Sequence, residues 1–150
     1  MNKRININSA EPKALKAMMG LESYLYQTAI SDTLKDLIKI RASQLNGCGY
    51  CIDLHAKAAL KNGETNQRIF LLNAWKETQG IFTGEEKAVL SITEAVTLIH
   101  QNGLPETIYE NARQHFDENQ IAQIIMAVVI INSWNRIAIS SLLQPGENFS

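Results

Sequence analysis

The sequence lacks an excess of charge of either sign. Its 150 residues include 14 lysines and arginines against 15 aspartates and glutamates, so the formal net charge is -1 at pH 7. Proteins that bind nucleic acid or anionic membrane surfaces need concentrated positive charge. We therefore expect neither nucleic acid nor a membrane as a partner, and a small molecule or another protein instead.

Cysteine is also scarce, because Cys48 and Cys51 are the only two in the chain. A chain of this length buries enough apolar surface to fold without a covalent staple, so we predict a single domain over residues 1–150. The first residues are basic at Lys3 and Arg4 but have no apolar run behind them, unlike a secretory signal. We expect a cytosolic protein, and in that reducing compartment a C-x-x-C pair is more often catalytic, redox-sensing or metal-binding than structural.

Strand patterns are missing as well. No segment alternates apolar and polar residues over the length of a strand, no Asn-Gly turn separates two apolar runs, and no repeat of fixed period occurs. Apolar residues instead recur every three or four positions, which predicts an all-α bundle of about six to seven helices. We expect helices at 9–26 with Gly20 as a candidate break, at 32–46, from about 50 to 61, at 66–76, from 84 to near 102, from 105 to about 116, and from 117 onward as the longest.

The most apolar segment, residues 121–143, predicts a buried helix. The polar residues that interrupt it leave apolar runs too short to span a bilayer, and they are Gln123, Asn132, Ser133, Asn135 and Arg136. Because the segment is apolar on more than one helix face, we expect it to be central to the bundle or buried between subunits. An uncompensated buried charge is costly, so we expect Arg136 to pair with a carboxylate or to line a pocket.

What the sequence does contain is one dense motif, Asn46-Gly47-Cys48-Gly49-Tyr50-Cys51-Ile52-Asp53-Leu54-His55. If the segment from about Gly49 onward is helical, Cys48, Cys51 and His55 lie on one helix face, because they are three and four positions apart. A helix N-terminus, a nearby imidazole and a C-x-x-C partner each lower a cysteine pKa from about 8.5 to roughly 3.5–7.5. The motif therefore predicts Cys51 as the nucleophile, His55 as its base and Cys48 as the resolving cysteine.

Other interpretations of this motif stay open. The two cysteines could be unreactive residues packed in the core on one helix face. The flanking glycines and the position of the motif at a turn disfavour this interpretation. A zinc site would use the cysteine pair and His55, with His100 or His115 needed as the fourth ligand. Haem attachment requires C-x-x-C-H and is excluded by Ile52, and a thioredoxin-like fold is excluded by the missing strands.

The residues from Leu37 to Glu64, LIKIRASQLNGCGYCIDLHAKAALKNGE, resemble the core motif of the AhpD-like alkyl hydroperoxidases within the carboxymuconolactone decarboxylase superfamily. Further similar features are Trp75, residues 82–86, His115-Phe116 and residues 132–136. The resemblance covers most of the chain and implies an all-helical bundle that assembles into homo-oligomers, commonly trimers or hexamers. It also implies a hydroperoxide or disulfide substrate and a protein or small-thiol reductant, and we expect no cofactor and no metal.

The resemblance assigns roles to individual residues. Cys51 falls on the peroxidatic position, Cys48 on the resolving one and His55 on the proton-relay histidine. Two positions depart from the family pattern. Asp36 stands where the family has a glutamate, and because its side chain is one methylene shorter we expect it to relay a proton through water. Tyr50 replaces the histidine often found between the two cysteines.

Without the resemblance, Asp36 is more simply a solvated helix residue near Lys35 and Lys39. The true lactone decarboxylases of the superfamily lack the cysteine pair, which makes decarboxylation the weaker prediction. We therefore predict thiol-dependent peroxidase or disulfide-exchange activity, with Tyr50 and Arg136 supporting the site. The alternative from another class is a non-catalytic module that responds to redox state or binds zinc.

Overall fold

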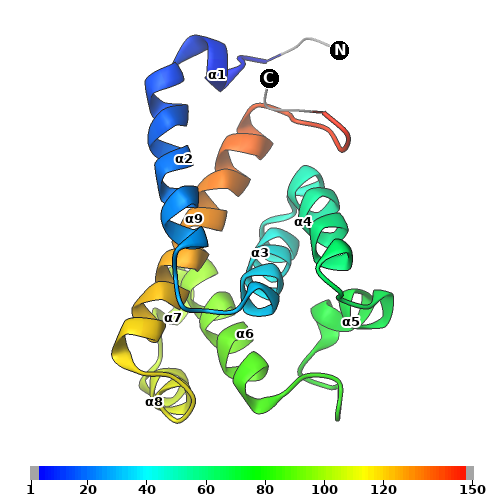
Figure 1. Ribbon diagram of the computed structural model, residues 1–150, viewed down its shortest axis with the longest axis vertical. Helices are drawn as coiled ribbons and strands as arrows, with labels where there is room; N and C mark the ends of the chain where they lie inside the picture. Colours follow the sequence, from blue (N-terminus) through cyan, green and yellow to red (C-terminus); the bar gives the residue numbers. More distant parts are fainter. Residues whose placement is uncertain (1–3, 148–150) are drawn as a thin grey trace.

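A computed structural model of the chain describes residues 4–147. In these residues it has nine α-helices, one 3-10 turn and no strand (Figure 1). The helices are α1 (Ile7–Ala10), α2 (Pro12–Tyr26), α3 (Asp32–Asn46), α4 (Gly49–Lys61), α5 (Asn66–Leu71), α6 (Gly84–Thr97), α7 (Ile99–Asn102), α8 (Glu106–Arg113) and α9 (Glu118–Ser140), with the 3-10 turn η1 (Leu72–Ala74) after α5. The predicted all-α fold is confirmed. The nine helices of residues 4–147 exceed the predicted six to seven because α1 and α7 are separate elements of 4 residues each.

Side-chain caps fix three of the helix starts. Ser31 accepts a hydrogen bond from a backbone amide in the first turn of α3 at 3.3 Å. Thr83 with Glu86, and Asp117 with Gln120, form capping boxes at the starts of α6 and α9. Each cap satisfies amide groups that a helix leaves unpaired, which is why the sequence predicts these starts correctly.

Two predicted helices differ in extent from those observed. α2 continues through Gly20, because one glycine costs a helix only about 1 kcal/mol. The segment predicted as one helix over 66–76 is α5 followed by η1, and Trp75 lies beyond both. Trp75 is buried, and its indole N–H donates to Glu94 on α6 at 2.7 Å. This tertiary contact, rather than helix propensity, determines the backbone there.

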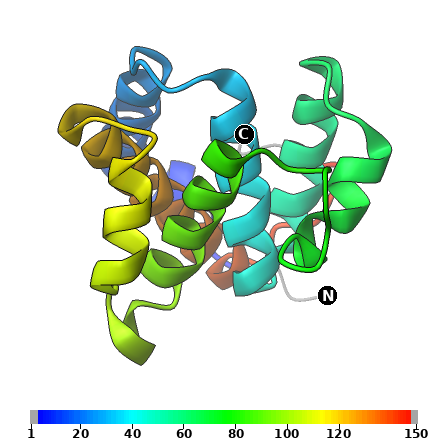
Figure 2. The ribbon, with the colours of Figure 1, turned by 90° about the horizontal axis from the view of Figure 1, so that it is seen from below.

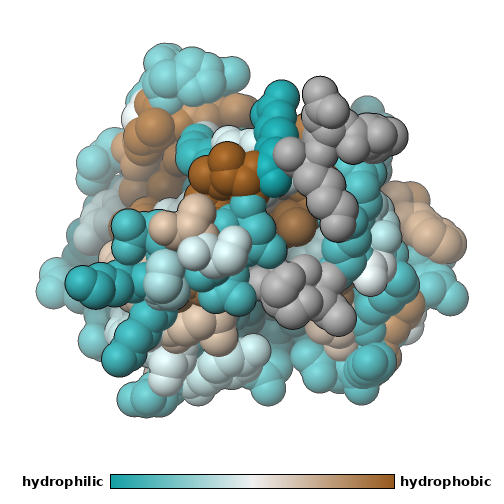
Figure 3. Space-filling view, turned by 90° about the horizontal axis from the view of Figure 1, so that it is seen from above, coloured by the Kyte–Doolittle hydropathy of each residue, from teal (hydrophilic) through white to brown (hydrophobic). Residues whose placement is uncertain are grey.

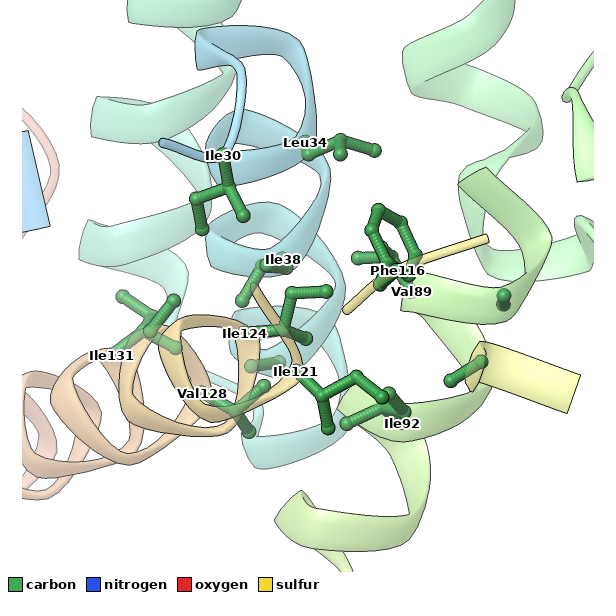
Figure 4. Packing of buried hydrophobic residues seen from close by; sticks show 14 of the residues in the cluster. Ile30, Leu34, Ile38, Val89, Ile92, Phe116, Ile121, Ile124, Val128 and Ile131 are labelled. Carbon is green, nitrogen blue, oxygen red and sulfur yellow. The ribbon is translucent and has the colours of Figure 1, made fainter. Parts of the chain in front are cut away.

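α3 is the central helix of the bundle. It packs against α4 on one side and against α6 and α9 on the other, as two directions of view show (Figures 1 and 2). The larger hydrophobic core lies between α3, α6 and α9 and includes Ile38, Ile92 and Val128 (Figure 4). A smaller core, which includes Leu37 and Leu90, lies where α3, α4, η1 and α6 meet. Because both cores contain residues of α3, this helix and the α4 that packs on it have fixed positions.

α9 has 23 residues and is the one helix in residues 4–147 whose length and composition would suit a membrane span. It packs against α2, α3, α4, α6 and α8, and Ile121, Ile124 and Ile131 are each at most 2% exposed. The predicted helix is therefore observed and packs into the core through the face that carries these residues. Val129 and Ile139 of the same helix remain exposed.

Candidate active site

The two cysteines lie in the turn that joins α3 to α4. Gly47 ends α3 with φ 69°, in the left-handed region that glycine adopts without strain, and the chain reverses there. Cys48 is the N-cap of α4, and its Sγ accepts a hydrogen bond from the amide of Cys51 at 3.3 Å. A disulfide joins the two cysteines, whose Cα atoms are 5.3 Å apart. The predicted placement of the C-x-x-C motif at a helix N-terminus is confirmed.

A buried amide network holds this turn against α9. The Asn46 side chain donates to Asn132 Oδ1 and to Asn135 Oδ1, each at 2.9 Å. Asn135 is fully buried and donates in turn to Ser43 Oγ at 3.0 Å. These bonds account for Asn132 and Asn135, two of the polar residues that interrupt the apolar sequence of α9, because each bond satisfies a group that would be costly to bury alone. The sequence shows the interruptions but not the partners that explain them.

A pocket of about 520 Å³ lies beside the cysteine turn, with walls from α2, α3, α4 and α9. Cys51 and His55 line it from α4, whereas Cys48 does not. Cys48 is buried in a small cluster with Ala138 and Leu143. The charged residues of the pocket wall are Glu22, Asp32, Lys35, Asp36 and Lys39.

His55 is partly buried in the pocket wall, one helix turn after Cys51. Its burial, reinforced by the positive charge of Lys39 and opposed by the Glu22 carboxylate, lowers the pKa of the imidazole from 6.5 to about 4. At neutral pH the ring is therefore uncharged and can accept a proton from a neighbouring thiol. A pKa of about 4 makes this imidazole a weaker base than an ordinary histidine, so it holds an accepted proton only briefly.

Asp36 lies in the same pocket and is 9% exposed. Its Oδ2 accepts a hydrogen bond from the Asn62 side chain at 2.9 Å, which joins α3 to the residue that follows α4. Burial raises the pKa of this carboxyl, against the opposing effects of the Asn62 hydrogen bond and the Lys39 charge. The alternative that Asp36 is a solvated surface residue is wrong, and its neighbours Lys35 and Lys39 are buried as well.

An ion pair that the sequence does not predict joins α2 to α3 in the pocket wall. The Lys39 ammonium binds the Glu22 carboxylate, and the indole N–H of Trp134 donates to Glu22 Oε2 at 3.2 Å. The same ammonium lies 5.6 Å from the centre of the Tyr26 ring. Glu22 and Lys39 lie on different helices, so only the tertiary fold brings them together. No spacing along one helix could have indicated the pair, because Glu22 and Lys39 are 17 residues apart in the sequence.

Tyr50 and Arg136, the two residues predicted to support the site, have different positions. Tyr50 is buried and lines the pocket, and burial together with the Glu147 carboxylate raises the pKa of its phenol. Arg136 is exposed and does not line the pocket. Its guanidinium donates to the carbonyl and side-chain oxygens of Asn132, at 3.0 and 2.9 Å. Within residues 4–147, Arg136 neither pairs with a carboxylate nor lines the pocket as predicted, and Asn132 one turn earlier accepts its hydrogen bonds at the surface of α9.

The metal interpretation needs a fourth ligand beside the cysteine pair and His55. His100 and His115 are exposed, and neither lines the pocket. Across the described residues 4–147, no three histidine, cysteine, aspartate or glutamate side chains are grouped so that they could hold a metal ion. The two cysteines are bonded to each other instead.

The chain is similar to proteins of one known family. Residues 12–95 match the profile of the carboxymuconolactone decarboxylase family. The uncharacterised protein YdfG of Bacillus subtilis (strain 168) is 44% identical over 140 residues, which cover 93% of this chain and 95% of YdfG.

Two solved structures share the fold. A protein of unknown function from Agrobacterium tumefaciens, described as a candidate antioxidant defence protein AhpD, superposes with a TM-score of 0.93 and 38% identity over 98% of this chain and 100% of its own. The debrominase Bmp8 superposes with a TM-score of 0.80 over 94% of this chain and 75% of its own. Its identity is 19%, so this second similarity supports the fold alone.

Proposed function

The chain belongs to the carboxymuconolactone decarboxylase family and is AhpD-like, and from this premise we propose that it is a thiol-dependent hydroperoxidase of the alkyl hydroperoxidase type. The observation that carries the proposal is the position of Cys51. It lines the pocket one helix turn before a histidine that is neutral at physiological pH. It is also joined to Cys48 by the disulfide that such a catalytic cycle would form.

In the first half of the cycle, the Cys51 thiolate attacks the terminal oxygen of a hydroperoxide. The O–O bond breaks, the peroxide is reduced to an alcohol, and Cys51 is oxidised to a sulfenic acid. His55 takes the proton of the Cys51 thiol and gives it to the leaving alkoxide, so the ring returns to its neutral form. Asp36 lines the same pocket and is the carboxyl through which protons exchange with water.

In the second half, Cys48 loses its proton and its thiolate attacks the sulfenic sulfur of Cys51, which forms the disulfide and expels hydroxide; the proton lost by Cys48 converts this hydroxide to water. The amide of Cys51, which donates to Cys48 Sγ at 3.3 Å, and the N-terminus of α4 both stabilise negative charge on Cys48. The same stabilisation makes Cys48 the better leaving group when an external dithiol reopens the bond by attacking Cys51 from the pocket. That dithiol, a protein or a small molecule, is oxidised to its disulfide.

Two other functions have less support. The lactone decarboxylases of the superfamily lack the cysteine pair, which here lies at the pocket. A non-catalytic module that responds to redox state or binds zinc is the alternative from another class. It would leave a pocket of about 520 Å³ beside Cys51 without a use.

Steady-state turnover separates these functions. The protein is assayed with several hydroperoxides and several dithiol reductants, and free thiols and zinc are measured on the same sample. We expect catalytic consumption of peroxide, loss of both thiols on oxidation and no stoichiometric zinc. Stoichiometric zinc with thiols that stay protected from peroxide would contradict the proposal.

We also propose that the protein works as a homo-oligomer, a trimer or hexamer, in the cytosol. Val129, Ile139 and Leu142 are exposed hydrophobic residues on or just after α9, and they support contact with a second copy of the chain. Figure 3 views the end of the molecule at which α9 finishes, where hydrophobic side chains lie between hydrophilic ones. Light scattering after size exclusion tests the assembly, and a monomer at micromolar concentration would contradict it.

A further inference from the structure

The pocket is longer than the chemistry at Cys51 requires. α3 and α4 run in opposite directions (Figure 1), and the hydrogen bond from Asn62 to Asp36 places the end of α4 beside the first half of α3. Asn62 and Cys51 both line the pocket, and they are about 16 Å apart along α4 at a rise of about 1.5 Å per residue. A small hydroperoxide at Cys51 would leave the far end of the pocket empty.

The wall between these two ends is mainly apolar. Leu54 on α4, Met19 on α2 and Trp134 on α9 contribute to it. Leu54 and Met19 are 47% and 54% exposed, so apolar side chains stand at the open edge of the pocket. Of the charged residues near this part of the wall, Glu22 pairs with Lys39, and Asp36 accepts a hydrogen bond from the Asn62 side chain at 2.9 Å. The wall therefore suits an apolar chain.

The far end of the pocket carries a lysine ammonium with a weak partner. Lys35 lines the pocket, and its side chain is 9% exposed. Its ammonium lies 3.6 Å from Asp32 Oδ1 and makes no hydrogen bond within residues 4–147. The Asp32 side chain is 78% exposed, so water competes for its carboxylate. The other lysine of the pocket, Lys39, already has a hydrogen-bonded partner in Glu22. Lys35 is therefore the lysine that is available to an anion from a ligand.

We propose that Lys35 binds a substrate carboxylate and that the substrate is the hydroperoxide of a long-chain fatty acid. This inference rests on the proposed peroxidase function and names its substrate class. The substrate carboxylate replaces Asp32 as the partner of Lys35, and the apolar chain lies along Leu54 and Met19 toward Cys51. The Cys51 thiolate then reduces the peroxide to a hydroxyl group and becomes a sulfenic acid, while the carboxylate is unchanged.

Binding of redox-inert analogues tests the Lys35 site without the peroxidase reaction. Decanoate and decanol have the same chain length and differ in the carboxylate, and their affinities are measured by calorimetry below the concentrations at which they aggregate. We expect the protein to bind decanoate about tenfold more tightly than decanol, because one hydrogen bond to a charged group contributes about that difference in affinity. Lys35→Met should abolish this preference, and Lys35→Arg should restore it.

Two further variants control for the loss of charge. Lys61→Met removes an exposed lysine at the end of α4 that does not line the pocket, and it should keep the preference for decanoate. Asp32→Asn removes the competing carboxylate and should strengthen decanoate binding. Equal affinities for decanoate and decanol, or an equal loss of preference in Lys61→Met and Lys35→Met, would overturn the inference.

Turnover then distinguishes a failure of this inference from a failure of the proposed function. Linoleic acid hydroperoxide, its methyl ester and tert-butyl hydroperoxide are compared, and Lys35→Met should raise the KM for the acid about tenfold relative to the KM values for the two neutral peroxides. If the neutral peroxides are turned over but the acid has no Lys35-dependent advantage, the inference fails and the peroxidase stands. If decanoate binds through Lys35 but no hydroperoxide is consumed, the acid site stands, while the peroxidase and its fatty-acid substrate are both ruled out.

Discussion

The two helices that face each other across the pocket contribute different groups. α4 supplies Cys51 and His55, with Cys48 as its N-cap, so the proposed redox chemistry and its first proton transfer lie within the first turns of one helix. α3 supplies no thiol to the pocket, but it carries two lysines, Lys35 and Lys39, and two aspartates, Asp32 and Asp36, into the wall. Groups on α4 are defined by spacing along one helix, whereas Asp36 and Lys39 on α3 acquire their roles through partners on other elements.

This difference separates the groups that react from the groups that set their charge and position. Glu22 holds Lys39 from α2, and Asn62 holds Asp36 from beyond the end of α4. The Lys39 charge in turn contributes to the lowered pKa of His55. We therefore expect changes on α4 to remove the reaction, and changes on α3 and its partners to alter rate, stability or substrate choice.

The largest effect is expected at Cys51. Cys51→Ser removes the one cysteine of the chain that lines the pocket, so peroxide consumption should fall to the rate measured without protein. The assay is steady-state turnover with a hydroperoxide and a dithiol reductant. Serine is close in size to cysteine, and an unchanged circular dichroism spectrum serves as the control for folding. Residual turnover above background would show that α4 does not hold the reactive group alone.

The next largest effect is expected at His55. His55→Asn removes the proton acceptor one turn from Cys51 and should lower kcat/KM for hydroperoxide by about 10²–10⁴-fold, the range typical of general acid–base catalysis. His100→Asn, which changes an exposed histidine outside the pocket, is the matched control and should keep full activity. A loss of less than tenfold in His55→Asn would mean that Cys51 is deprotonated by another group.

The ion pair between α2 and α3 should affect stability. Glu22→Gln leaves the Lys39 ammonium in the pocket wall without its carboxylate, and we expect the free energy of unfolding to fall by about 3–5 kcal/mol. Urea denaturation measures it. The double variant Glu22→Gln with Lys39→Met should recover much of the loss, because no unpaired charge is left. Losses that simply add in the double variant would show that the pair is not coupled.

Acid should destabilise the protein through His55. Its pKa is 6.5 in the unfolded chain and about 4 in the folded protein, so between these values the unfolded state binds more protons. The free energy of unfolding should therefore decrease as pH falls from 6.5 to 4, by about 3 kcal/mol from this group. His55→Asn should lack that decrease. The raised pKa of Asp36 has the opposite sign and is common to both proteins. Parallel stability curves for wild type and variant would contradict the assignment.

The smallest of these effects is expected at Asp36. Asp36→Asn keeps the size of the side chain and a hydrogen-bonding oxygen for Asn62, and it removes only the proton-exchanging carboxyl. We expect kcat/KM to fall by about tenfold or less, which is a smaller loss than in His55→Asn. An equal loss in the two variants would show that Asp36 is a full member of the relay and that α3 takes part in the reaction itself.

The part of the site on α4 could be predicted from the sequence, because its groups share one helix. Spacings of three and four residues fix which side chains share a face, and Gly47 marks the turn before them. Helix starts with side-chain caps, such as Ser31 and Thr83, could be predicted for the same local reason.

The part on α3 could not be predicted in the same way. Lys35 and Lys39 look like ordinary surface lysines until α2 and α4 pack beside them. Arg136 was placed wrongly for the converse reason, since a charge within an apolar segment suggests burial, and only the fold shows that this position of α9 is exposed. The early end of α5 likewise follows from the contact between Trp75 and Glu94 rather than from local propensity.

The most direct test of the central claim, that Cys51 is the peroxide-reactive cysteine, is to locate the sulfenic acid. Cys48→Ser and Cys51→Ser are each treated with one equivalent of hydroperoxide in the presence of dimedone, and the adduct is mapped by mass spectrometry. We predict an adduct on Cys51 in Cys48→Ser and none on Cys48 in Cys51→Ser. An adduct on Cys48 in Cys51→Ser, with no reaction in Cys48→Ser, would reverse the roles of the two cysteines and contradict the assignment.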